Sequence, residues 1–345
     1  MISNKTIIAS IIITTTLLSS IITYAIIKHN THHRIPTSTK SEKITETYSN
    51  NFDLKRIEGY QYIKPLSWAE EDLQSTELTN LQNKIIKKIE AYKKDGSIAS
   101  ASVYLKIFGK EKWFCINDTE TYFPGSLMKV AGLISYLRME ENTPGLLNKK
   151  ITFNTPVGEI IPNQTFNSNR IKPGETHTVK ELLKYMVAYS DNNATFLLNK
   201  NADNKAFLKL FSDLNITLKS GANGNALMNV KDYSRLLTII YNSSYLSINH
   251  SEYAAELLSQ CDFKKGMVKA LPPNTKVVHK FGEMRDSNYH QLHESGIIYS
   301  KNETFLLTIM TKGVDVNKLP DVISDITKIT YKNISEISDQ ISIIF

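Results

Sequence analysis

Strand-like segments lie on both sides of a long helical middle in this 345-residue chain. Residues 98–108 and 112–116 are rich in β-branched and apolar side chains, and the intervening Gly109-Lys110-Glu111 predicts a hairpin. Segments of the same character follow near the other end, at residues 275–280, 294–300 and 304–311. Because strands need partners to bury their apolar faces, we expect one sheet assembled from distant halves of the chain.

The region between the strands carries helix signals. Thr178 and Glu181 form a capping-box pattern that opens a helix reaching Val187, and Asn229 is placed to cap another. Further helices are expected at residues 75–94, 126–137, 252–258 and 319–332, and Phe196-Leu197-Leu198 starts another. The pattern predicts an α/β (α+β) fold, in which helices flank the sheet and an all-helical subdomain is inserted at about residues 145–262.

Ser126 and Lys129 are three residues apart at the head of one predicted helix. Residues at that spacing share a helix face, so the lysine amine can reach the serine hydroxyl. A lysine that is desolvated there can give up its proton near neutral pH and act as the base for a serine nucleophile. The Ser-x-x-Lys pattern alone is common, and an ordinary serine beside a solvated lysine is the alternative.

Two further motifs follow downstream. Ser190-Asp191-Asn192 lies at a junction between predicted helices, where these residue types also serve as plain caps. Lys280-Phe281-Gly282 ends the apolar strand at residues 275–280. With the three motifs in this order, the chain resembles the penicillin-recognising active-site serine hydrolases, the class A β-lactamases and their penicillin-binding-protein relatives. The resemblance covers about residues 60–335 and includes Phe123-Pro124-Gly125 before the nucleophile.

This resemblance implies an antiparallel sheet of the β-lactamase/transpeptidase-like fold, and it assigns roles to individual residues. Ser126 attacks an amide or lactam carbonyl and Lys129 takes its proton, which gives a covalent acyl-enzyme. The backbone N–H groups of Ser126 and Glu283 form the oxyanion hole. Ser190 relays a proton to the leaving nitrogen, and Lys280 supplies positive charge beside it. The substrate-binding residues implied are Asn192 and Gly282.

The chain departs from the family pattern at two points. Phe281 stands where Thr or Ser is usual, so a hydroxyl for the substrate carboxylate is missing, and Arg285 is its expected replacement. Class A β-lactamases also carry a loop Glu that activates the deacylating water, whereas residues 219–226 contain no carboxylate. Glu283 is a candidate substitute base, the alternative being an ordinary surface loop residue. Deacylation is therefore expected to be slow.

The expected function is that of a serine acyl hydrolase acting on β-lactam or peptidoglycan stem-peptide amides. A D-alanyl-D-alanine peptidase or penicillin-binding protein with slow deacylation is the second interpretation. A non-catalytic sensor of β-lactams or wall fragments is the third, and Phe281 together with the missing loop Glu allows it. The presence of Ser126, Lys129, Ser190 and Lys280 argues against a lapsed site.

Residues 7–27 form an uncharged, largely apolar segment between Lys5 and Lys28. The segment is long enough to span a bilayer, which takes about 20 residues. An uncleaved anchor is favoured over a cleaved signal peptide, because the apolar run continues past the poor cleavage site at residues 23–25. We expect a membrane anchor or uncleaved signal at residues 1–28, a polar tether at 29–56 and the hydrolase domain at 57–345.

The flanking charges and the family resemblance predict opposite orientations for this anchor. The positive residues that follow the segment, such as Lys28 and Arg34, would by themselves retain the domain in the cytoplasm. The family resemblance favours the opposite, since its members act on wall peptides or antibiotics outside the inner membrane. We therefore expect a single-pass membrane protein with the hydrolase domain outside the cytoplasm, periplasmic or extracellular.

No cofactor, metal, nucleic acid or obligate protein partner is indicated. Cys115 and Cys261 are the only cysteines, and buried thiols are expected, with one disulfide as the alternative. His279 and His293 lie on adjacent predicted strands, but no third ligand has suitable spacing, so we expect satisfied strand histidines. The net charge of +7 comes from scattered Lys and Arg, which does not indicate a nucleic-acid-binding surface.

Overall fold

The computed structural model describes residues 52–57, 66–71, 74–154, 165–166, 168–202, 204–221, 226–301 and 303–342. Its centre is a five-stranded antiparallel sheet in the order β4-β3-β11-β10-β9. The strands are β3 (Ser100–Ile107), β4 (Lys112–Ile116), β9 (Lys276–Arg285), β10 (His290–Tyr299) and β11 (Thr304–Gly313). Val103 of β3 lies opposite Ile309 of β11, so the early hairpin and the late strands join as predicted.

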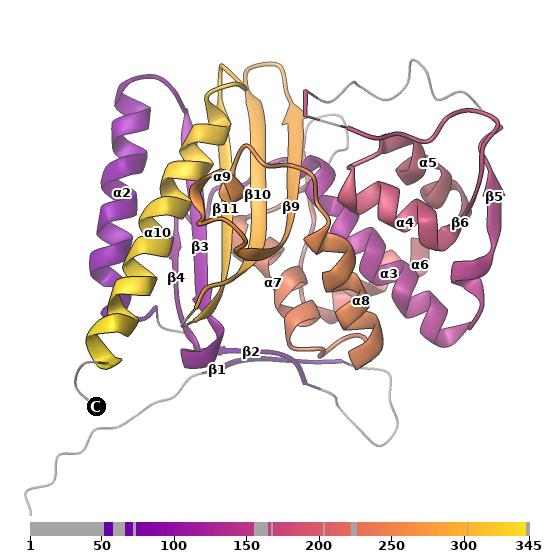
Figure 1. The fold of residues 1–345 in the computed structure, drawn as a ribbon, viewed down its shortest axis with the longest axis horizontal. Coiled ribbons are helices and arrows are strands. Elements are labelled where there is room, and N and C mark those ends of the chain that lie inside the picture. Colours follow the sequence, from indigo (N-terminus) through magenta and orange to yellow (C-terminus); the bar gives the residue numbers. More distant parts are fainter. Residues whose placement is uncertain are drawn as a thin grey trace, which may run out of the picture. The chain divides into compact units, whose positions relative to one another are not determined.

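Helices cover both faces of the sheet (Figure 1). One face packs against α2 (Thr79–Lys94) and α10 (Leu319–Ser342), with the short α9 (Met267–Ala270) beside α10. The other face packs against α7 (Val230–Tyr241). Because successive strand residues point to opposite faces, Val103 and Leu105 lie in one apolar core and Tyr104 lies in the other.

The helical insertion contains α4 (Val179–Ala188), α5 (Asn192–Asn201), α6 (Asn204–Asp213), α7 and α8 (Ile248–Ser259), and α3 (Lys129–Asn142) precedes it. Both predicted caps are present. The Thr178 hydroxyl accepts from the Glu181 amide in a capping box, and the Asn229 side chain accepts from the Asp232 amide. The helix α8 begins earlier than predicted, because the Ser247 side chain caps its first turn.

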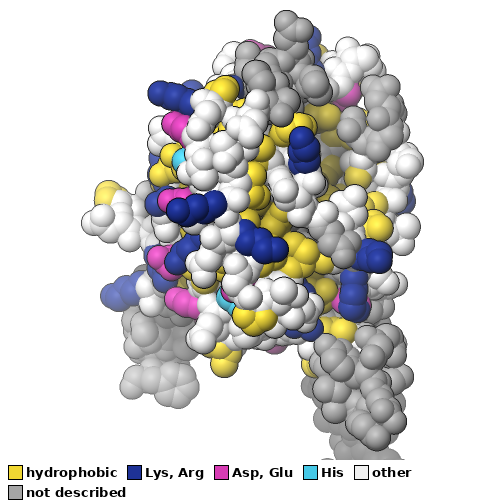
Figure 2. All heavy atoms as spheres, turned by 90° about the vertical axis from the view of Figure 1, so that its right-hand side faces the viewer, with side chains coloured by type: hydrophobic (Ala, Val, Ile, Leu, Met, Phe, Trp, Pro, Cys, Tyr) yellow, Lys and Arg dark blue, Asp and Glu magenta, His cyan; other side chains and the backbone are white. Residues whose placement is uncertain are grey.

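Short elements complete the described chain. They are the two-stranded ladders β5 (Lys150–Thr152) with β6 (Thr176–Thr178) and β7 (Lys219–Ser220) with β8 (Ala226–Leu227), and the 3-10 turns η1 (Thr76–Leu78), η2 (Phe108–Lys110), η3 (Gly125–Met128) and η4 (Leu146–Asn148). Figure 2 looks at the end that carries α4 and α5, where Lys and Arg side chains are spread over the face and apolar side chains are visible between them. This spread agrees with the scattered charge of the sequence.

One element boundary differs from the prediction in a way that matters for the site. The third motif, Lys280-Phe281-Gly282, lies in the middle of β9 and does not end it, since the strand continues to Arg285. The reason is the length of β10, which pairs with the whole of β9 and places Glu294 opposite Phe281 and His290 opposite Arg285. The backbone of the motif is therefore paired with β10 along its whole length, at the edge of the sheet.

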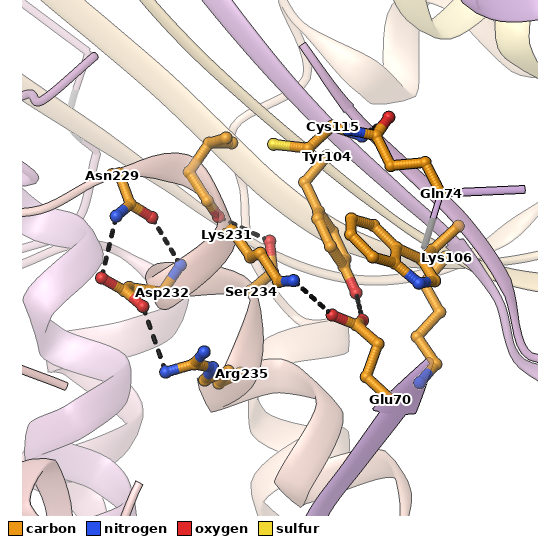
Figure 3. Close-up of polar contacts among 12 residues, drawn as sticks. Glu70, Gln74, Tyr104, Lys106, Cys115, Asn229, Lys231, Asp232, Ser234 and Arg235 are labelled. Carbon is orange, nitrogen blue, oxygen red and sulfur yellow. Dashed lines mark hydrogen bonds and ion pairs between the residues drawn. The ribbon is translucent and has the colours of Figure 1, made fainter. Parts of the chain in front are cut away.

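A hairpin that the sequence did not predict lies at the start of the domain. It consists of β1 (Phe52–Arg56), which falls within the expected polar tether, and β2 (Leu66–Glu71). The buried Glu70 fixes β2 to the sheet: its carboxylate accepts from the Tyr104 hydroxyl and pairs with Lys231 at 2.8 Å (Figure 3). The Lys231 amine also lies 4.0 Å from the centroid of the Trp113 ring. One carboxylate thus joins β2, β3 and α7.

Both cysteines are buried and free, as the buried-thiol interpretation predicted. Burial raises the pKa of the Cys115 thiol to about 12. The apolar segment at residues 7–27 lies outside the described residues. Among the residues described, no helix combines the length and the apolar character needed to cross a bilayer.

Candidate active site

The turn that carries Ser126 packs directly against the middle of β9. Gly125 has a φ of +55°, and a Cβ there would lie 2.4 Å from the Glu283 carbonyl oxygen. A Cβ on Gly282 would lie 2.4 Å from the Pro124 carbonyl oxygen. Both positions therefore need glycine so that the strand backbone can approach the nucleophile turn. This contact places the third motif beside the first.

The second motif is held by its own backbone and by Asp191. Ser190 has a φ of +54°, a left-handed conformation that is uncommon for a residue with a side chain. The buried Asp191 carboxylate caps α5 by accepting from the Asn193 amide at 2.9 Å, and it also accepts from the Ile171 amide at 2.9 Å. Burial raises the pKa of Asp191, against these hydrogen bonds. Asp191 is therefore a helix cap, as the alternative interpretation of the motif expected. Ser190 and Asn192 make other contacts.

Lys129 joins the first motif to the second. Its buried amine donates to the Ser190 carbonyl oxygen at 2.6 Å, to Asn192 Oδ1 at 2.8 Å and to Ser190 Oγ at 3.2 Å. Burial lowers the pKa of the Lys129 amine well below its ordinary value, and the positive charge of Lys280 lowers it further. These are the conditions under which a lysine acts as a base.

Lys280 is fully buried, and its amine donates to the Phe281 carbonyl oxygen at 2.8 Å. Burial lowers the pKa of Lys280 to about 8, although the nearby Cys261 and Asp262 oppose that effect. Its charge reaches the Lys129 amine, as the lowered pKa of that group indicates. Phe281 itself is buried in the opposite core and stacks on Phe263 at 4.5 Å, so this position presents a core ring in place of the usual hydroxyl.

Glu283 is not the surface loop residue that one interpretation of the sequence expected. It lies in β9 and not in a surface loop, and its carboxylate accepts from the Thr165 amide at 2.8 Å, the Thr165 hydroxyl at 2.5 Å and the Phe166 amide at 3.2 Å. These contacts occupy the carboxylate as an acceptor. The contacts favour a structural role in holding residues 165–166 beside the site.

The described flanks of the loop expected to supply a deacylating Glu lie next to Tyr122 and Phe123, which lead into the nucleophile turn. Met228 forms a bridge with Tyr122, and a Cβ on Gly221 would lie 2.6 Å from the Phe123 ring. Residues 222–225 lie outside the described part of the chain. The sequence places no carboxylate anywhere in 219–226, so this loop brings none to the site.

The two strand histidines do not share a site. His279 bonds to Glu294 at 2.7 Å; burial alone would lower its pKa, but Cys261 and Glu294 raise it to about 10. His293 donates to the Phe123 carbonyl oxygen at 3.0 Å and accepts from the Thr311 amide, and burial lowers its pKa to about 4. Within the described residues there is no cluster of three or more metal-ligating side chains. His293 is therefore a satisfied strand histidine, as expected, whereas the buried Nε2 of His279 has no hydrogen-bond partner within the described residues.

Two supports of the nucleophile turn were not found by sequence reasoning. Gln291 accepts from the Phe123 amide at 3.0 Å, while His293 donates to the Phe123 carbonyl. Both come from β10 and lie two residues apart, so they share a face of the strand. Polar residues alternating within a buried strand were the signal that could have indicated them. Together they fix the residue that leads into Pro124, Gly125 and Ser126.

A cavity of about 650 Å³ opens at Ser126. Its lining includes most residues predicted for the site, namely Ser126, Lys129, Asn192, Glu283 and Arg285. The backbones expected to form the oxyanion hole therefore border one space with the lysine amine. Ser190 and Lys280 are not among the described lining residues, and they act on this space through Lys129.

A sequence model of the β-lactamase enzyme family matches residues 81–334, which is most of the chain and includes all three motifs. The chain belongs to the β-lactamase enzyme family. It is therefore a β-lactamase-family protein of the active-site serine hydrolase type, and the recognition made from the motifs is confirmed. A search of curated proteins gives no significant match for this family member.

Solved structures give the same fold at low sequence identity. A mutant of PBP-A in an acyl-enzyme complex with penicillin G aligns with a TM-score of 0.64 and 16% identity over 75% of this chain and 97% of that chain. The TLA-1 extended-spectrum β-lactamase aligns at 0.62 and 20% identity over 72% and 98%. A class A β-lactamase from Mycobacterium abscessus aligns at 0.61 and 14% identity over 74% and 99%. The β-lactamase-family fold predicted from sequence is confirmed.

Proposed function

We propose that this β-lactamase-family protein forms an acyl-enzyme on Ser126 with β-lactam or peptidoglycan stem-peptide amides. The observation that carries the proposal is the buried Lys129 amine, which borders the same cavity as Ser126 and has a strongly lowered pKa. Two short donor bonds, to Ser190 O and Asn192 Oδ1, use both N–H groups of a neutral amine. The third contact, to Ser190 Oγ at 3.2 Å, is then not a donated hydrogen bond, and the one lone pair of the amine takes the proton of Ser126 in the proposed reaction.

In the proposed reaction, Ser126 Oγ attacks the carbonyl carbon while its proton passes to Lys129 Nζ. The oxyanion is stabilised by the N–H groups of Ser126 and Glu283, and the proton leaves through the Ser190 hydroxyl to the departing nitrogen. Water then releases the acyl group in a second step. Neither residues 219–226 nor the occupied Glu283 carboxylate supports a base for that step, which favours a long-lived acyl-enzyme.

The retained geometry of Lys129 favours catalysis over the sensor alternative. A sensor does not need a neutral lysine beside its serine, whereas an acylating enzyme does. Between a β-lactamase and a D-alanyl-D-alanine peptidase, the missing deacylating base favours the slow turnover expected of a penicillin-binding peptidase. A mutant of PBP-A, which shares the fold, forms an acyl-enzyme complex with penicillin G.

Intact-mass measurement after incubation with penicillin G tests the proposal. We expect the mass of one penicillin to be added to the protein, and a peptide map to place it on Ser126. The Ser126→Ala variant should gain no mass. An adduct of the same size on that variant would refute the assignment of the nucleophile.

We also propose that residues 1–28 anchor the protein in a membrane, with the hydrolase domain outside the cytoplasm. The support is the length of the uncharged segment at residues 7–27 and the extracytoplasmic substrates proposed here. A C-terminal fusion to a reporter that is active only in the cytoplasm tests it. Reporter activity would show that the positive charges after the segment set the orientation.

A further inference from the structure

The cavity that begins at Ser126 continues along one face of α3. Met128, Gly132, Tyr136 and Met139 line it, and their spacing of three or four residues places them in one stripe. Met186 of α4 and Phe207 of α6 close the space from the neighbouring helices. We call the part of the cavity lined by these six residues the α3 groove. It offers methyl, thioether and ring surfaces. A volume of about 650 Å³ lies within the roughly 300–1,000 Å³ of typical ligand sites.

The hydroxyl groups that border the α3 groove are already engaged. Ser135 donates to the Ala131 carbonyl oxygen at 2.8 Å, and Tyr136 donates to the Leu198 carbonyl oxygen at 2.6 Å. Thr195 donates to the Asp191 carbonyl oxygen at 2.7 Å. Their protons are used within the protein, so these side chains present mainly carbon to the cavity. The groove is more apolar than its residue types suggest.

The charged groups among the described lining residues lie at the Ser126 end. They are Lys129, Glu283 and Arg285, and the first two are occupied by the hydrogen bonds described above. The hydroxyl expected to bind a substrate carboxylate is replaced by the core ring of Phe281. Away from the Ser126 end, the described lining offers a charged group only the neutral amides of Asn199 and Asn204 and no side chain of opposite charge, so burying a charge there is unfavourable.

We propose that the acyl group taken by Ser126 carries an extended, uncharged apolar chain or ring system, and that this part of it lies along the α3 groove. The proposal rests on the acyl-enzyme function above and names its substrate class. An acyl-enzyme keeps its acyl group beside Ser126 until water removes it, so the neighbouring cavity has to hold that group. Three methionines line the groove, and their flexible thioethers adapt to chains of differing shape.

The experiment uses p-nitrophenyl esters, in which acylation of Ser126 breaks the ester C–O bond and releases p-nitrophenolate, and water then releases the carboxylic acid. The series is acetate, butyrate and octanoate, together with the half-ester of suberic acid. Suberate matches octanoate in length but ends in a carboxylate. We expect kcat/KM to rise by on the order of 10²–10³ from acetate to octanoate, because methylene groups are buried. The suberate half-ester should show only a small part of this rise in kcat/KM.

Matched variants locate the effect. Gly132→Leu fills the groove, since a Cβ there meets only the flexible Met186 side chain at 3.6 Å. It should lower the octanoate-to-acetate ratio of kcat/KM by about tenfold or more. Phe207→Gln should lower the ratio several-fold. Leu208→Gln, at the next residue, changes a side chain that is 62% exposed and outside the groove, so the ratio should stay at the wild-type value.

Labelling of Ser126 by a fluorophosphonate separates the two proposals, because this reagent needs the nucleophile but no long acyl group. Labelled wild-type protein without a rise from acetate to octanoate would overturn the groove assignment and leave the proposed function intact. Equal effects of Phe207→Gln and Leu208→Gln would overturn it as well. Absence of labelling would count against the nucleophile itself. A variant that labels normally is folded at the site, so a loss of its octanoate preference supports the proposal.

Discussion

The amine of Lys129 donates a 2.6 Å hydrogen bond to the carbonyl oxygen of Ser190, a residue held at a φ of +54°. The left-handed backbone brings the carbonyl and the hydroxyl of Ser190 to the same amine. Such a conformation is unfavourable for a serine by about 1–3 kcal/mol, and the surrounding fold has to impose it. Asp191 does so by capping α5 and accepting from the Ile171 amide. The site therefore depends on α3, α4 and α5 packing together.

Removal of the Lys129 amine should slow acylation strongly. For Lys129→Met we expect the rate of penicillin acylation to fall by on the order of 10²–10⁴, because the positioned base is lost. Time-resolved intact mass measures the rate. Lys200→Met is the matched control, since Lys200 is an exposed residue of α5. Near-normal acylation of the Lys129 variant would assign the base to another group.

Acylation should follow a bell-shaped pH profile with an anionic penicillin. The neutral form of Lys129 is the base, so the rate falls as the pH drops below its lowered pKa. The pKa of Lys280 is about 8, so its positive charge, and with it attraction for the anion, is lost above that pH. Lys280→Gln should abolish the alkaline limb. It should also move the acidic limb to higher pH, because the charge of Lys280 no longer lowers the pKa of Lys129. An acidic limb that stays in place would show that the two lysines are not coupled.

Turnover of a chromogenic β-lactam should begin with a burst of about one equivalent of product. The residues that normally activate the deacylating water have no counterpart in 219–226, so the second step is slower than the first. Stopped-flow absorbance measures both phases. Steady turnover near a typical roughly 10 s⁻¹ without a burst would contradict slow deacylation. Glu283→Gln would then be the informative variant, since a collapse of turnover with acylation retained would make Glu283 the base.

A methyl group at residue 282 should disturb the nucleophile turn without unfolding the protein. The Cβ of Gly282→Ala would lie 2.4 Å from the Pro124 carbonyl oxygen and 2.7 Å from the Leu127 amide, so backbone has to move. We expect fluorophosphonate labelling of Ser126 to slow by at least tenfold, because a shift of about 1 Å at a catalytic group costs on the order of 10²-fold. Gly109→Ala is the control, as only the Glu303 side chain comes near, at 3.5 Å. Equal labelling of the two variants would show that the close approach is not needed.

Loss of the Glu70 carboxylate should destabilise the domain. Glu70→Gln breaks a pair in which the glutamate side chain is 1% exposed and Lys231 is 24% exposed. Breaking a buried pair costs roughly 3–5 kcal/mol of unfolding free energy, and we expect about 3 because Lys231 keeps some solvent. Urea unfolding midpoints measure the difference. The control Glu77→Gln removes a side chain that is 69% exposed and pairs with Lys112, so its effect should stay within about 1 kcal/mol. A similar loss of unfolding free energy in both variants would show that the burial of Glu70 does not increase the contribution of its ion pair.

Local signals were sufficient for much of this architecture. The capping box at Thr178 and the cap at Asn229 depend on side chains within three residues of each other, so their outcome is decided by the sequence nearby. The hairpin of β3 and β4 likewise follows from two apolar runs and a short turn. The motif at Ser126 and Lys129 follows from helical spacing, and its recognition as part of a β-lactamase family rested on the order of three short motifs.

Other features depended on contacts between distant residues. The length of β9 was set by its partner β10, and the hairpin of β1 and β2 contains the buried Glu70 that only β3 and α7 can satisfy. The occupation of Glu283 by Thr165 and Phe166 joins residues more than a hundred positions apart. No window of neighbouring sequence carries that information.

The sequence by itself determined the chemical groups of the site, because Ser126, Lys129, Ser190 and Lys280 supply a nucleophile, amines and a hydroxyl whatever the fold. Only the tertiary structure decided the pKa values and the geometry of these groups. The pKa of Lys129 is lowered because packing removes water from its amine and brings Lys280 near it. The φ of Ser190 and the close approach of Gly282 to Pro124 are likewise imposed by packing. Desolvation and close contact arise when distant segments meet, so they are properties of the assembled molecule.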